Sequence, residues 1–348
     1  MIIRAIAFTK NGTKRLESLV QKDEENIWEL FDPETNSYSD FLEESFRMKS
    51  VVLFVGAMGI AVRMLIPFAK DKLSDSPVIV MDEAGKYVIP VLSGHVGGAN
   101  RYAKYFAKLL SAEPVITTAT DVNHLFSVDC FAVENGMEIL NREGIRFVSG
   151  KLLEEGSIRV FVSDKVSFDK AEVPQEIIIT DKWEAADVII LASSEEISDD
   201  VMSYKKDCLI LKMKPFILGM GCRKGMEAER IQAVLKEAFS ENKIAEDVGI
   251  AFLATIDLKK KEYGLVRFAG ERKLLLRTFS AEELRNVPGD FSESQYVEKT
   301  VGVSNVCERA AMCLAGEGEL IMKKFAKDGV TAALVKRKEV IRWWKETE

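Results

Sequence analysis

The 348-residue sequence has few of the residues that cross-link or metallate proteins: five cysteines, two histidines and no Cys-x-x-Cys pair. An odd number of widely spaced cysteines argues against a disulfide framework and against a structural zinc site. Long apolar runs are also missing, because the longest, 51–62, contains two glycines and is shorter than the ~18 residues of a membrane helix. The apolar start, residues 1–8, is too short for a signal peptide. We therefore expect a cytoplasmic protein with no membrane partner.

Several catalytic signatures are absent as well. The sequence contains no G-x-x-x-x-G-K-[ST], no H-E-x-x-H and no G-x-S-x-G, which leaves a P-loop NTPase, a zincin protease and an α/β-hydrolase elbow unsupported. Excess positive charge is missing too: 48 basic and 55 acidic residues give a net charge of −7. Because nucleic-acid-binding domains are normally basic, we expect no nucleic acid partner.

Short β-branched runs alternate along the chain with stretches of helical period. Runs such as 51–55, 87–92 and 187–191 are apolar almost throughout, which is typical of strands buried on both faces of a parallel sheet. Between such runs, 99–110 and 227–239 place their apolar residues on one helix face. This alternation predicts an α/β fold of two or three small doubly wound domains with largely parallel sheets.

Two changes of pattern suggest domain boundaries. Periodicity weakens over 121–141, and Pro215 ends a strand before a new β-loop-α unit begins. We therefore predict an N-terminal α/β domain over 1–125, a middle α/β domain over 126–213 and a C-terminal α/β domain over 214–348.

A glycine-rich loop, SGHVGGAN over 93–100, joins the strand 87–92 to the helix 99–110. Glycines let the backbone approach a ligand, and a helix N-terminus attracts anions. His95 is an imidazole at the carboxyl end of a strand, where it can act as a base near neutral pH. A tight βα turn with a structural histidine is the alternative. The candidate binding residues here are Ser93, Gly94, Gly97, Gly98 and Asn100.

A second polar cluster, Thr117, Thr118, Thr120 and Asp121, follows the short strand 114–117. If this strand is a parallel neighbour of 87–92, the cluster emerges at the same sheet edge as the histidine loop. Its hydroxyls and carboxylate could then orient the imidazole. A polar turn with an Asx cap is the alternative. The other histidine, His124, lies in a less regular stretch, and we expect it to be structural.

Two more glycine segments are candidate anion loops, although a purely structural role remains open for each. The first follows the strand 51–55 and opens a predicted helix. The second has the spacing G-x-G-x-x-x-G, one residue longer than the dinucleotide fingerprint, and its adjacent cations suit an anionic ligand. The candidate binding residues are Gly56, Gly59 and Arg63 in the first segment and Gly219, Gly221, Arg223 and Lys224 in the second.

Taken in order, these segments resemble the cobalamin-biosynthesis protein G (CbiG) family, the cobalt-precorrin-5A hydrolases. The N-terminal part is similar through GAMGIAVR (56–63), DEAG (82–85), SGHVGGAN (93–100) and PVITTATD (114–121). The C-terminal part is similar through GMGCRKG (219–225), TID (255–257), FSAEEL (279–284) and VGV (301–303). The middle region, 126–213, carries no matching motif.

The resemblance implies a hydrolase of anaerobic cobalamin (vitamin B12) biosynthesis. Its substrate would be a cobalt-containing contracted tetrapyrrole, whose ring A δ-lactone is opened with release of acetaldehyde to give cobalt-precorrin-5B. Cobalt would arrive inside the substrate, so the resemblance implies no cofactor or metal held by the protein. Neighbouring enzymes of the pathway are candidate partners.

For this chemistry we hypothesise that His95 is the base that activates water and that Asp121 orients it. Amides of Gly97 and Gly98 would stabilise the oxyanion, and the glycine loops with nearby arginines and Lys224 would bind the carboxylate arms. Two other functions stay open. A non-enzymatic tetrapyrrole carrier needs the anion loops but no base, and a dinucleotide-dependent oxidoreductase is disfavoured by the glycine spacing.

Overall fold

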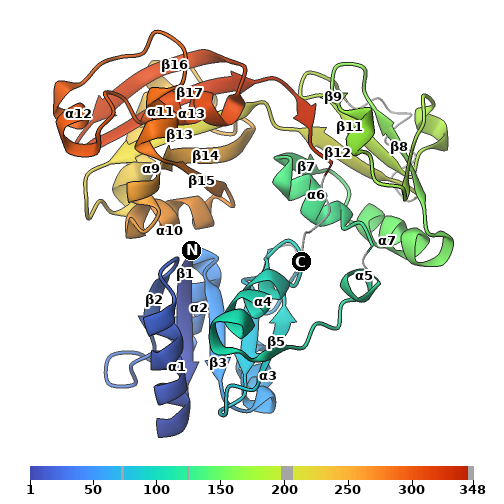
Figure 1. Ribbon diagram of the computed structural model, residues 1–348, viewed down its shortest axis with the longest axis vertical. Coiled ribbons are helices and arrows are strands. Elements are labelled where there is room, and N and C mark those ends of the chain that lie inside the picture. The colour runs from blue at the N-terminus through green and yellow to red at the C-terminus, as the bar shows by residue number, and fades with distance from the viewer. Residues whose placement is uncertain (72–73, 124, 197–206, 344–348) are drawn as a thin grey trace.

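A computed structural model describes residues 1–71, 74–123, 125–196 and 207–343 (Figure 1). Within this part the chain forms an N-terminal, a middle and a C-terminal unit, each built on one sheet of five or six strands. The sheets are largely parallel and carry helices on their faces, so the predicted α/β class is confirmed. The predicted domain boundaries stay a prediction. His124 lies outside the described residues.

The N-terminal sheet has the order β2-β1-β3-β4-β5-β6. Its elements are β1 Ile2–Ala7, α1 Lys10–Lys22, β2 Ile27–Leu30, α2 Tyr38–Met48, β3 Val51–Val55, α3 Met58–Leu65, β4 Val78–Met81, β5 Tyr87–Leu92, α4 Ala99–Leu110 and β6 Glu113–Pro114. Strands β1 to β4 are parallel, whereas β5 is antiparallel to β4, and β6 is parallel to β5. Loops that follow β1, β3 and β4 therefore emerge at one edge of the sheet, and loops that follow β5 and β6 emerge at the opposite edge.

The middle sheet has the order β10-β8-β11-β12-β7, with only β7 antiparallel. The short helix α5, Ala119–Val122, follows β6 and leads into this unit. The unit itself comprises α6 Val128–Glu134, β7 Met137–Ile139, α7 Glu143–Glu155, β8 Ile158–Val162, β9 Ser167–Phe168, β10 Ile177–Ile179, β11 Val188–Leu191 and β12 Leu209–Met213, with short 3₁₀ turns at Lys170–Glu172 and Trp183–Ala185. The last described residues also belong here. Strand β18, Val340–Ile341, pairs with β9, and Trp343 is buried in this unit's core. Residues 340–343 thus pack with the middle unit.

The C-terminal sheet has the order β15-β14-β13-β17-β16. Its elements are β13 Phe216–Cys222, α9 Ala228–Glu241, β14 Ile250–Ile256, a 3₁₀ turn Asp257–Lys259, α10 Tyr263–Glu271, β15 Leu275–Phe279, α11 Ala281–Arg285, α12 Gln295–Val301, α13 Cys307–Ala315, β16 Gly318–Lys327 and β17 Val330–Arg337. The first three strands of the chain in this unit are parallel, and β17 and β16 are antiparallel to their neighbours.

Two of the predicted anion-loop glycines belong to this sheet rather than to a loop. Gly219 and Gly221 lie inside β13. A Cβ at Gly219 would lie 1.8 Å from the carbonyl oxygen of Cys307, and one at Gly221 would lie 2.8 Å from Oγ1 of Thr331. These glycines are therefore needed so that α13 and β17 can pack closely against β13. This packing favours the structural alternative for both glycines.

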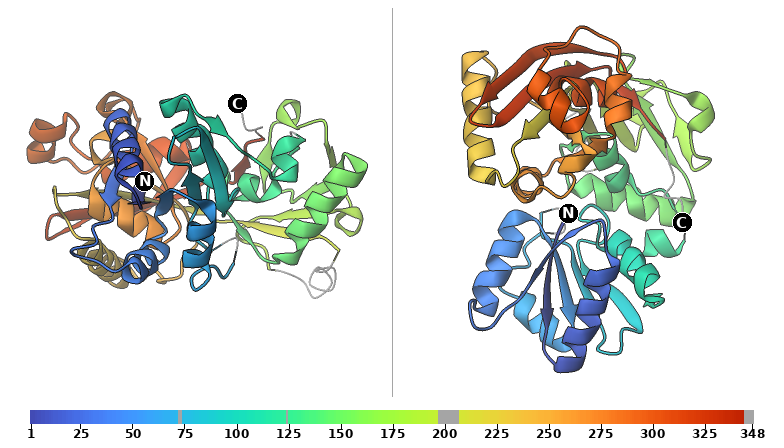
Figure 2. Two further views of the ribbon diagram at one scale, coloured as in Figure 1. Left: turned by 90° about the horizontal axis from the view of Figure 1, so that it is seen from below. Right: turned by 60° about the vertical axis from the view of Figure 1, so that its left-hand side comes forward.

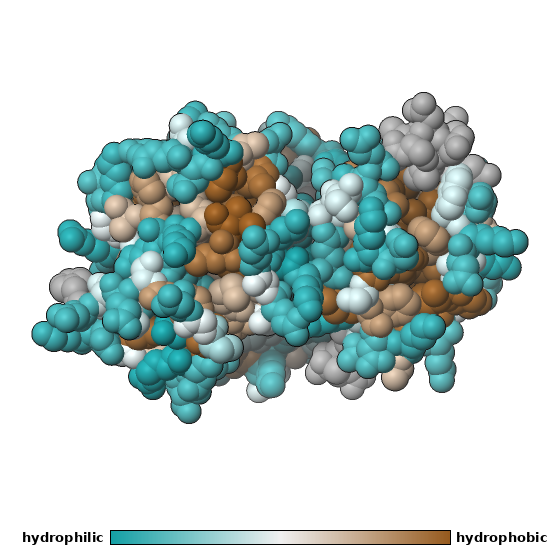
Figure 3. Space-filling view, turned by 90° about the horizontal axis from the view of Figure 1, so that it is seen from above, coloured by the Kyte–Doolittle hydropathy of each residue, from teal (hydrophilic) through white to brown (hydrophobic). Residues whose placement is uncertain are grey.

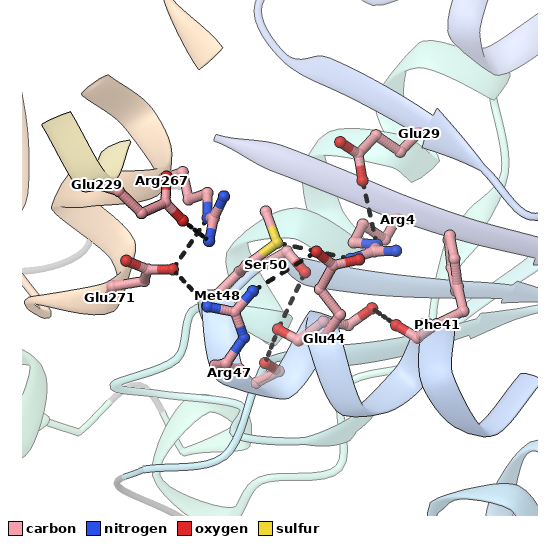
Figure 4. A network of polar contacts seen from close by, with 12 residues as sticks. Arg4, Glu29, Phe41, Glu44, Arg47, Met48, Ser50, Glu229, Arg267 and Glu271 are labelled. Atoms are coloured by element: carbon pink, nitrogen blue, oxygen red, sulfur yellow. Dashed lines mark hydrogen bonds and ion pairs between the residues drawn. The ribbon is translucent and has the colours of Figure 1, made fainter. Parts of the chain in front are cut away.

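The N-terminal unit joins the C-terminal unit through a polar network (Figure 4). Arg47 on α2 contacts Glu271 on α10 at 3.1 Å, and Arg267 bridges Glu271 at 3.0 Å and Glu229 at 2.6 Å. Beside this network the backbone of Met48 fits against Gly270, where a Cβ would lie 2.5 Å from the Met48 carbonyl oxygen. The right-hand view of Figure 2 shows the resulting arrangement, with the N-terminal unit below the other two.

The middle unit joins the C-terminal unit through Arg337 at the end of β17. Its guanidinium donates to the carbonyls of Asn135 at 2.7 Å and Lys214 at 3.0 Å and lies 5.2 Å from the ring centre of Phe252. Burial lowers the pKa of Arg337 to about 10. An arginine that caps two backbone carbonyls from different elements fixes the distance between the two sheets.

We find no membrane-spanning helix among these described residues. None of their helices combines the length and the apolar character needed to cross a bilayer. Seen from above, hydrophilic residues surround separate apolar areas over the C-terminal and middle units (Figure 3).

The packing around Gly219 yields a stability prediction. We expect Gly219→Ala to lower the free energy of unfolding by ~1–3 kcal/mol, because the new methyl group must push α13 off the sheet. Gly150→Ala is the matched control: a Cβ at this position in helix α7 would meet no atom within 4 Å, and alanine favours a helix. Urea denaturation of both variants measures the effect. Unchanged stability of Gly219→Ala together with lost ligand binding would restore the loop interpretation.

Candidate functional site

His95 lies between two carboxylates. Its Nε2 donates to Oδ2 of Asp121 at 2.7 Å and lies 3.1 Å from Oγ1 of Thr120. Its Nδ1 lies 3.5 Å from Oδ1 of Asp129. The side chains of the two aspartates are only 9% and 8% exposed, and that of His95 is 19% exposed. The expected contact between His95 and Asp121 is thus observed, and it arises because β5 and β6 are parallel neighbours.

Other predicted residues of the two loops hold this cluster in place. Asn100, at the start of α4, donates from Nδ2 to Oδ2 of Asp121 at 3.0 Å and to Oγ1 of Thr118 at 3.1 Å. Ser93 donates from its hydroxyl to the Asp75 carbonyl at 3.0 Å. Asp121 therefore receives hydrogen bonds from both His95 and Asn100, which fixes its orientation. Thr117 is exposed and stands outside these contacts.

Three amides of the glycine loop donate hydrogen bonds within the loop itself. The N–H of Gly98 donates to the His95 carbonyl at 2.8 Å, that of Ala99 to Ser93 at 3.1 Å and that of Asn100 to Gly94 at 3.0 Å. Gly98 has a φ of 85°, a conformation that favours glycine. The amide of Gly98 is thus already engaged, so its predicted role in an oxyanion hole is not supported by this geometry. The tight turn instead orients the imidazole of His95 toward Asp121.

The two carboxylates determine the charge of His95. Burial by itself would lower the pKa of the imidazole, but the hydrogen bond with Asp121 and the interaction with Asp129 outweigh it and raise the pKa to about 10. Burial opposes ionisation of the two aspartates, yet the adjacent imidazolium lowers the pKa of each. At neutral pH the site therefore holds one cation between two anions. A protonated His95 can donate a proton, but it cannot accept one until it has done so.

A cavity of about 340 Å³ opens onto His95 where the three units meet. The histidine loop forms one wall, α6 of the middle unit forms another, and Leu275 at the start of β15 completes it. In Figure 1 the N-terminal unit, α6 and β15 surround this junction. The lining residues are Gly94, His95, Val96, Gly98, Asn100, Arg101, Cys130, Val133, Glu134 and Leu275.

The segment with Gly56, Gly59 and Arg63 does not reach this cavity. It follows β3, which is antiparallel to β5 through β4, so it emerges at the opposite edge of the N-terminal sheet. Arg63 is exposed there. Strand direction therefore separates this loop from His95 in the structure, and its role in anion binding stays a prediction.

Arg223 and Lys224 are likewise remote from His95. Both are exposed and follow the carboxyl end of β13, whereas the other end of that strand adjoins Lys214 and the middle unit. Seven strand residues span about 20 Å at ~3.3 Å each. The C-terminal unit thus contributes Leu275 to the cavity and leaves its predicted cations at the far end of the sheet.

Sequence reasoning missed Asp129, which contacts His95 from α6. No motif marks it, because it lies after the recognised blocks in a stretch without clear periodicity. The available signal was local: Ser127 precedes the helix and an acidic residue lies in its first turn, as at many helix starts. That pattern predicts a helix start and gives no indication of a histidine partner.

Among the described residues, no group of three or more His, Cys, Asp or Glu side chains is arranged to hold a metal ion.

Comparison with known protein families matches both ends of the chain. The family described as "Cobalamin synthesis G N-terminal" matches residues 40–121, and the family described as "Cobalamin synthesis G C-terminus" matches residues 216–335. His95 and Asp121 lie within the first match, whereas Asp129 lies between the two.

Similar proteins carry a consistent name. The chain is 31% identical over 311 residues to the cobalt-precorrin-5A hydrolase of Salmonella typhimurium, and the alignment covers 88% of this chain and 87% of that protein. It is 31% identical over 324 residues to the cobalt-precorrin-5A hydrolase of Priestia megaterium, and this alignment covers 90% of this chain and 85% of that protein. The crystal structure of a cobalamin biosynthesis protein G homologue from Sulfolobus solfataricus aligns over 96% of both chains at 22% identity and a TM-score of 0.42.

The charge of His95 is directly measurable. We expect NMR titration of the imidazole to show a cation through pH 7–9 and loss of the proton as the pH rises toward about 10. The sign follows from the raised pKa: its stabilising contribution is complete below the unfolded value of ~6.5 and is lost as pH passes the folded value. His95→Gln identifies the resonance. An imidazole that titrates near 6.5 would contradict the ion-pair arrangement.

Proposed function

The chain belongs to the cobalamin synthesis G family, and from this premise we propose that it is a cobalt-precorrin-5A hydrolase. The substrate class is a cobalt-containing contracted tetrapyrrole with a ring A lactone. Cobalt belongs to the substrate in this proposal, and the protein contributes only its own side chains. One observation carries the proposal at residue level: a partly buried imidazolium, held by carboxylates, lines the cavity at the junction of the three units.

The size of the cavity supports binding of one edge of the substrate. At about 340 Å³ it lies at the lower end of the ~300–1,000 Å³ of pockets that enclose drug-sized ligands. A tetrapyrrole with its acid side chains exceeds that size. The lactone-bearing edge would therefore enter between the histidine loop and α6, while the rest of the macrocycle stays outside against the walls of the junction.

The lining suits an apolar ring with an anionic rim. Val96, Val133 and Leu275 offer apolar contact to the macrocycle. Arg101 is exposed at the start of α4 and lines the same cavity, so its guanidinium is the cation best placed for a substrate carboxylate. Arg101 replaces Arg63, Arg223 and Lys224 as the candidate for this role.

The charge of His95 changes the order of proton transfers in our hypothesis. Water attacks the acyl carbon of the lactone and gives up a proton to solvent, the acyl C–O bond breaks, and the departing alkoxide takes the proton of His95. The new carboxylic acid ionises. Neutral His95 then accepts the hydroxyl proton while the C–C bond to the macrocycle breaks, acetaldehyde leaves, and the electron pair stays on the macrocycle. His95 thus serves first as acid and then as base, and Asp121 holds it in place.

The two other functions make different demands on this site. A carrier needs a binding surface but no proton donor. A partly buried imidazolium between two carboxylates, a costly arrangement without function, therefore favours the enzyme. An oxidoreductase needs a glycine turn for the pyrophosphate, whereas Gly219 and Gly221 lie inside a strand. Neighbouring enzymes of the pathway remain expected partners for transfer of the product.

Anaerobic incubation with the cobalt-containing lactone and trapping of acetaldehyde tests the function. We expect turnover by the wild type and a ~10²–10⁴-fold lower kcat for His95→Gln, since general acid–base catalysis contributes that much, with substrate affinity nearly unchanged. Activity should fall as pH rises toward the pKa of about 10, because the proton donor is then lost.

His124→Gln is the matched control, since no catalytic or binding role is assigned to that histidine, and it should keep wild-type turnover. Tight binding without aldehyde release by the wild type would select the carrier. Full turnover by His95→Gln would refute the role of His95 and leave the family function intact.

A further inference from the structure

Asp129 belongs to the segment that connects the two family-matched regions. It is the second residue of α6 in the middle unit, beyond the match that ends at residue 121 and before the one that begins at 216. Nevertheless its carboxylate is buried, and Oδ1 lies 3.5 Å from Nδ1 of His95. A connecting unit would have no need to place an acid against the imidazole of another unit.

The position of the Asp129 carboxylate is fixed by its own neighbours. Oδ1 accepts hydrogen bonds from the Ser127 hydroxyl at 2.7 Å and from the Cys130 amide at 3.0 Å. Both donors belong to the start of α6, so the carboxylate moves only with that helix. The next turn of α6 supplies Val133 and Glu134 to the cavity wall. The Nδ1 edge of His95 therefore faces the helix that borders the cavity.

The two nitrogens of His95 differ in how firmly their protons are held. Nε2 lies 2.7 Å from Asp121, which is a short charge-assisted hydrogen bond, whereas Nδ1 lies 3.5 Å from Asp129, beyond a normal hydrogen bond. Asp121 thus orients the ring. The proton on Nδ1 is attracted by a full charge but is not enclosed by it, so a substrate oxygen can compete for it.

We propose that Asp129 is a positioning residue that keeps the Nδ1 proton on His95 until the substrate accepts it. The middle unit then completes the catalytic group of the N-terminal unit. This role rests on the proposed hydrolase function, but the effect of Asp129 on His95 can be measured without substrate.

The charges around His95 set the expected size of the effect. Asp121 and Thr120 contact the ring from α5, and Asp129 contacts it from α6. Arg101 and Glu134 line the cavity beside it. Removing the charge of Asp129 leaves Asp121 in contact with Nε2, so the ring should keep its orientation and should still bind a proton more tightly than a free imidazole does.

The experiment compares Asp129→Asn with Asp129→Glu. Asparagine keeps the oxygen that accepts from Ser127 and Cys130 but removes the charge, and we expect the proton affinity of His95, measured by NMR, to fall at least ~10-fold. The alkaline limb of the kcat–pH profile should move to lower pH by as many pH units as the pKa of His95 falls. Asp129→Glu restores the charge and should recover both values in large part. Asp181→Asn, an exposed residue of the same unit, is the matched control and should change neither.

The outcomes separate this proposal from the hydrolase function. A fall in His95 proton affinity with Asp129→Asn, reversed by Asp129→Glu, supports it even if no aldehyde is detected, in which case the hydrolase function fails alone. Equal proton affinity and equal pH profiles in wild type and Asp129→Asn overturn it. If Asp129→Asn does not fold, Ser127→Ala tests the same contact, because loss of the hydroxyl donor should loosen the carboxylate and shift the His95 titration measurably. An unchanged titration in that variant also overturns the proposal.

Discussion

The antiparallel pairing of β5 with β4 determines where the N-terminal unit can perform chemistry. In the parallel part of the sheet, carboxyl-end loops point away from the other units. Reversal at β5 sends the loop after this strand, and the loop after its parallel neighbour β6, to the opposite edge. His95 and Asp121 consequently meet at the edge that faces α6 and β15. Without that reversal, the imidazole would share an edge with Gly56 and would face solvent.

The second constraint is the local balance of charge. A buried imidazolium is unfavourable alone, and two buried aspartates are unfavourable alone, but together they stabilise one another. Asp121 arrives from the loop after β6 and Asp129 from the middle unit. The protonation state of His95 therefore depends on how two units pack, which links tertiary structure directly to proton transfer.

Much of the framework follows from local sequence pattern. The strand 51–55 and the helix 99–110 have the predicted bounds, because continuous apolar runs and one-sided periodicity are strong local signals. The contact of His95 with Asp121 followed from one topological assumption. The remote position of Gly56 could not be predicted, since the direction of β5 depends on the whole sheet. The pattern around Gly219 was ambiguous, because close helix packing and ligand binding both select glycine. Asp129 was missed because its partner lies in another unit.

The return of the chain to the middle unit has a mechanical consequence. The polypeptide passes from the middle to the C-terminal unit after β12 and comes back after β17, where β18 pairs with β9 and Trp343 enters the core. Two covalent tethers, together with Arg337, restrict rotation between these units. A single linker connects the N-terminal unit to them. The position of the N-terminal unit against the other two therefore depends on non-covalent contacts such as the Arg47–Glu271 ion pair, and so does the width of the cavity that His95 lines.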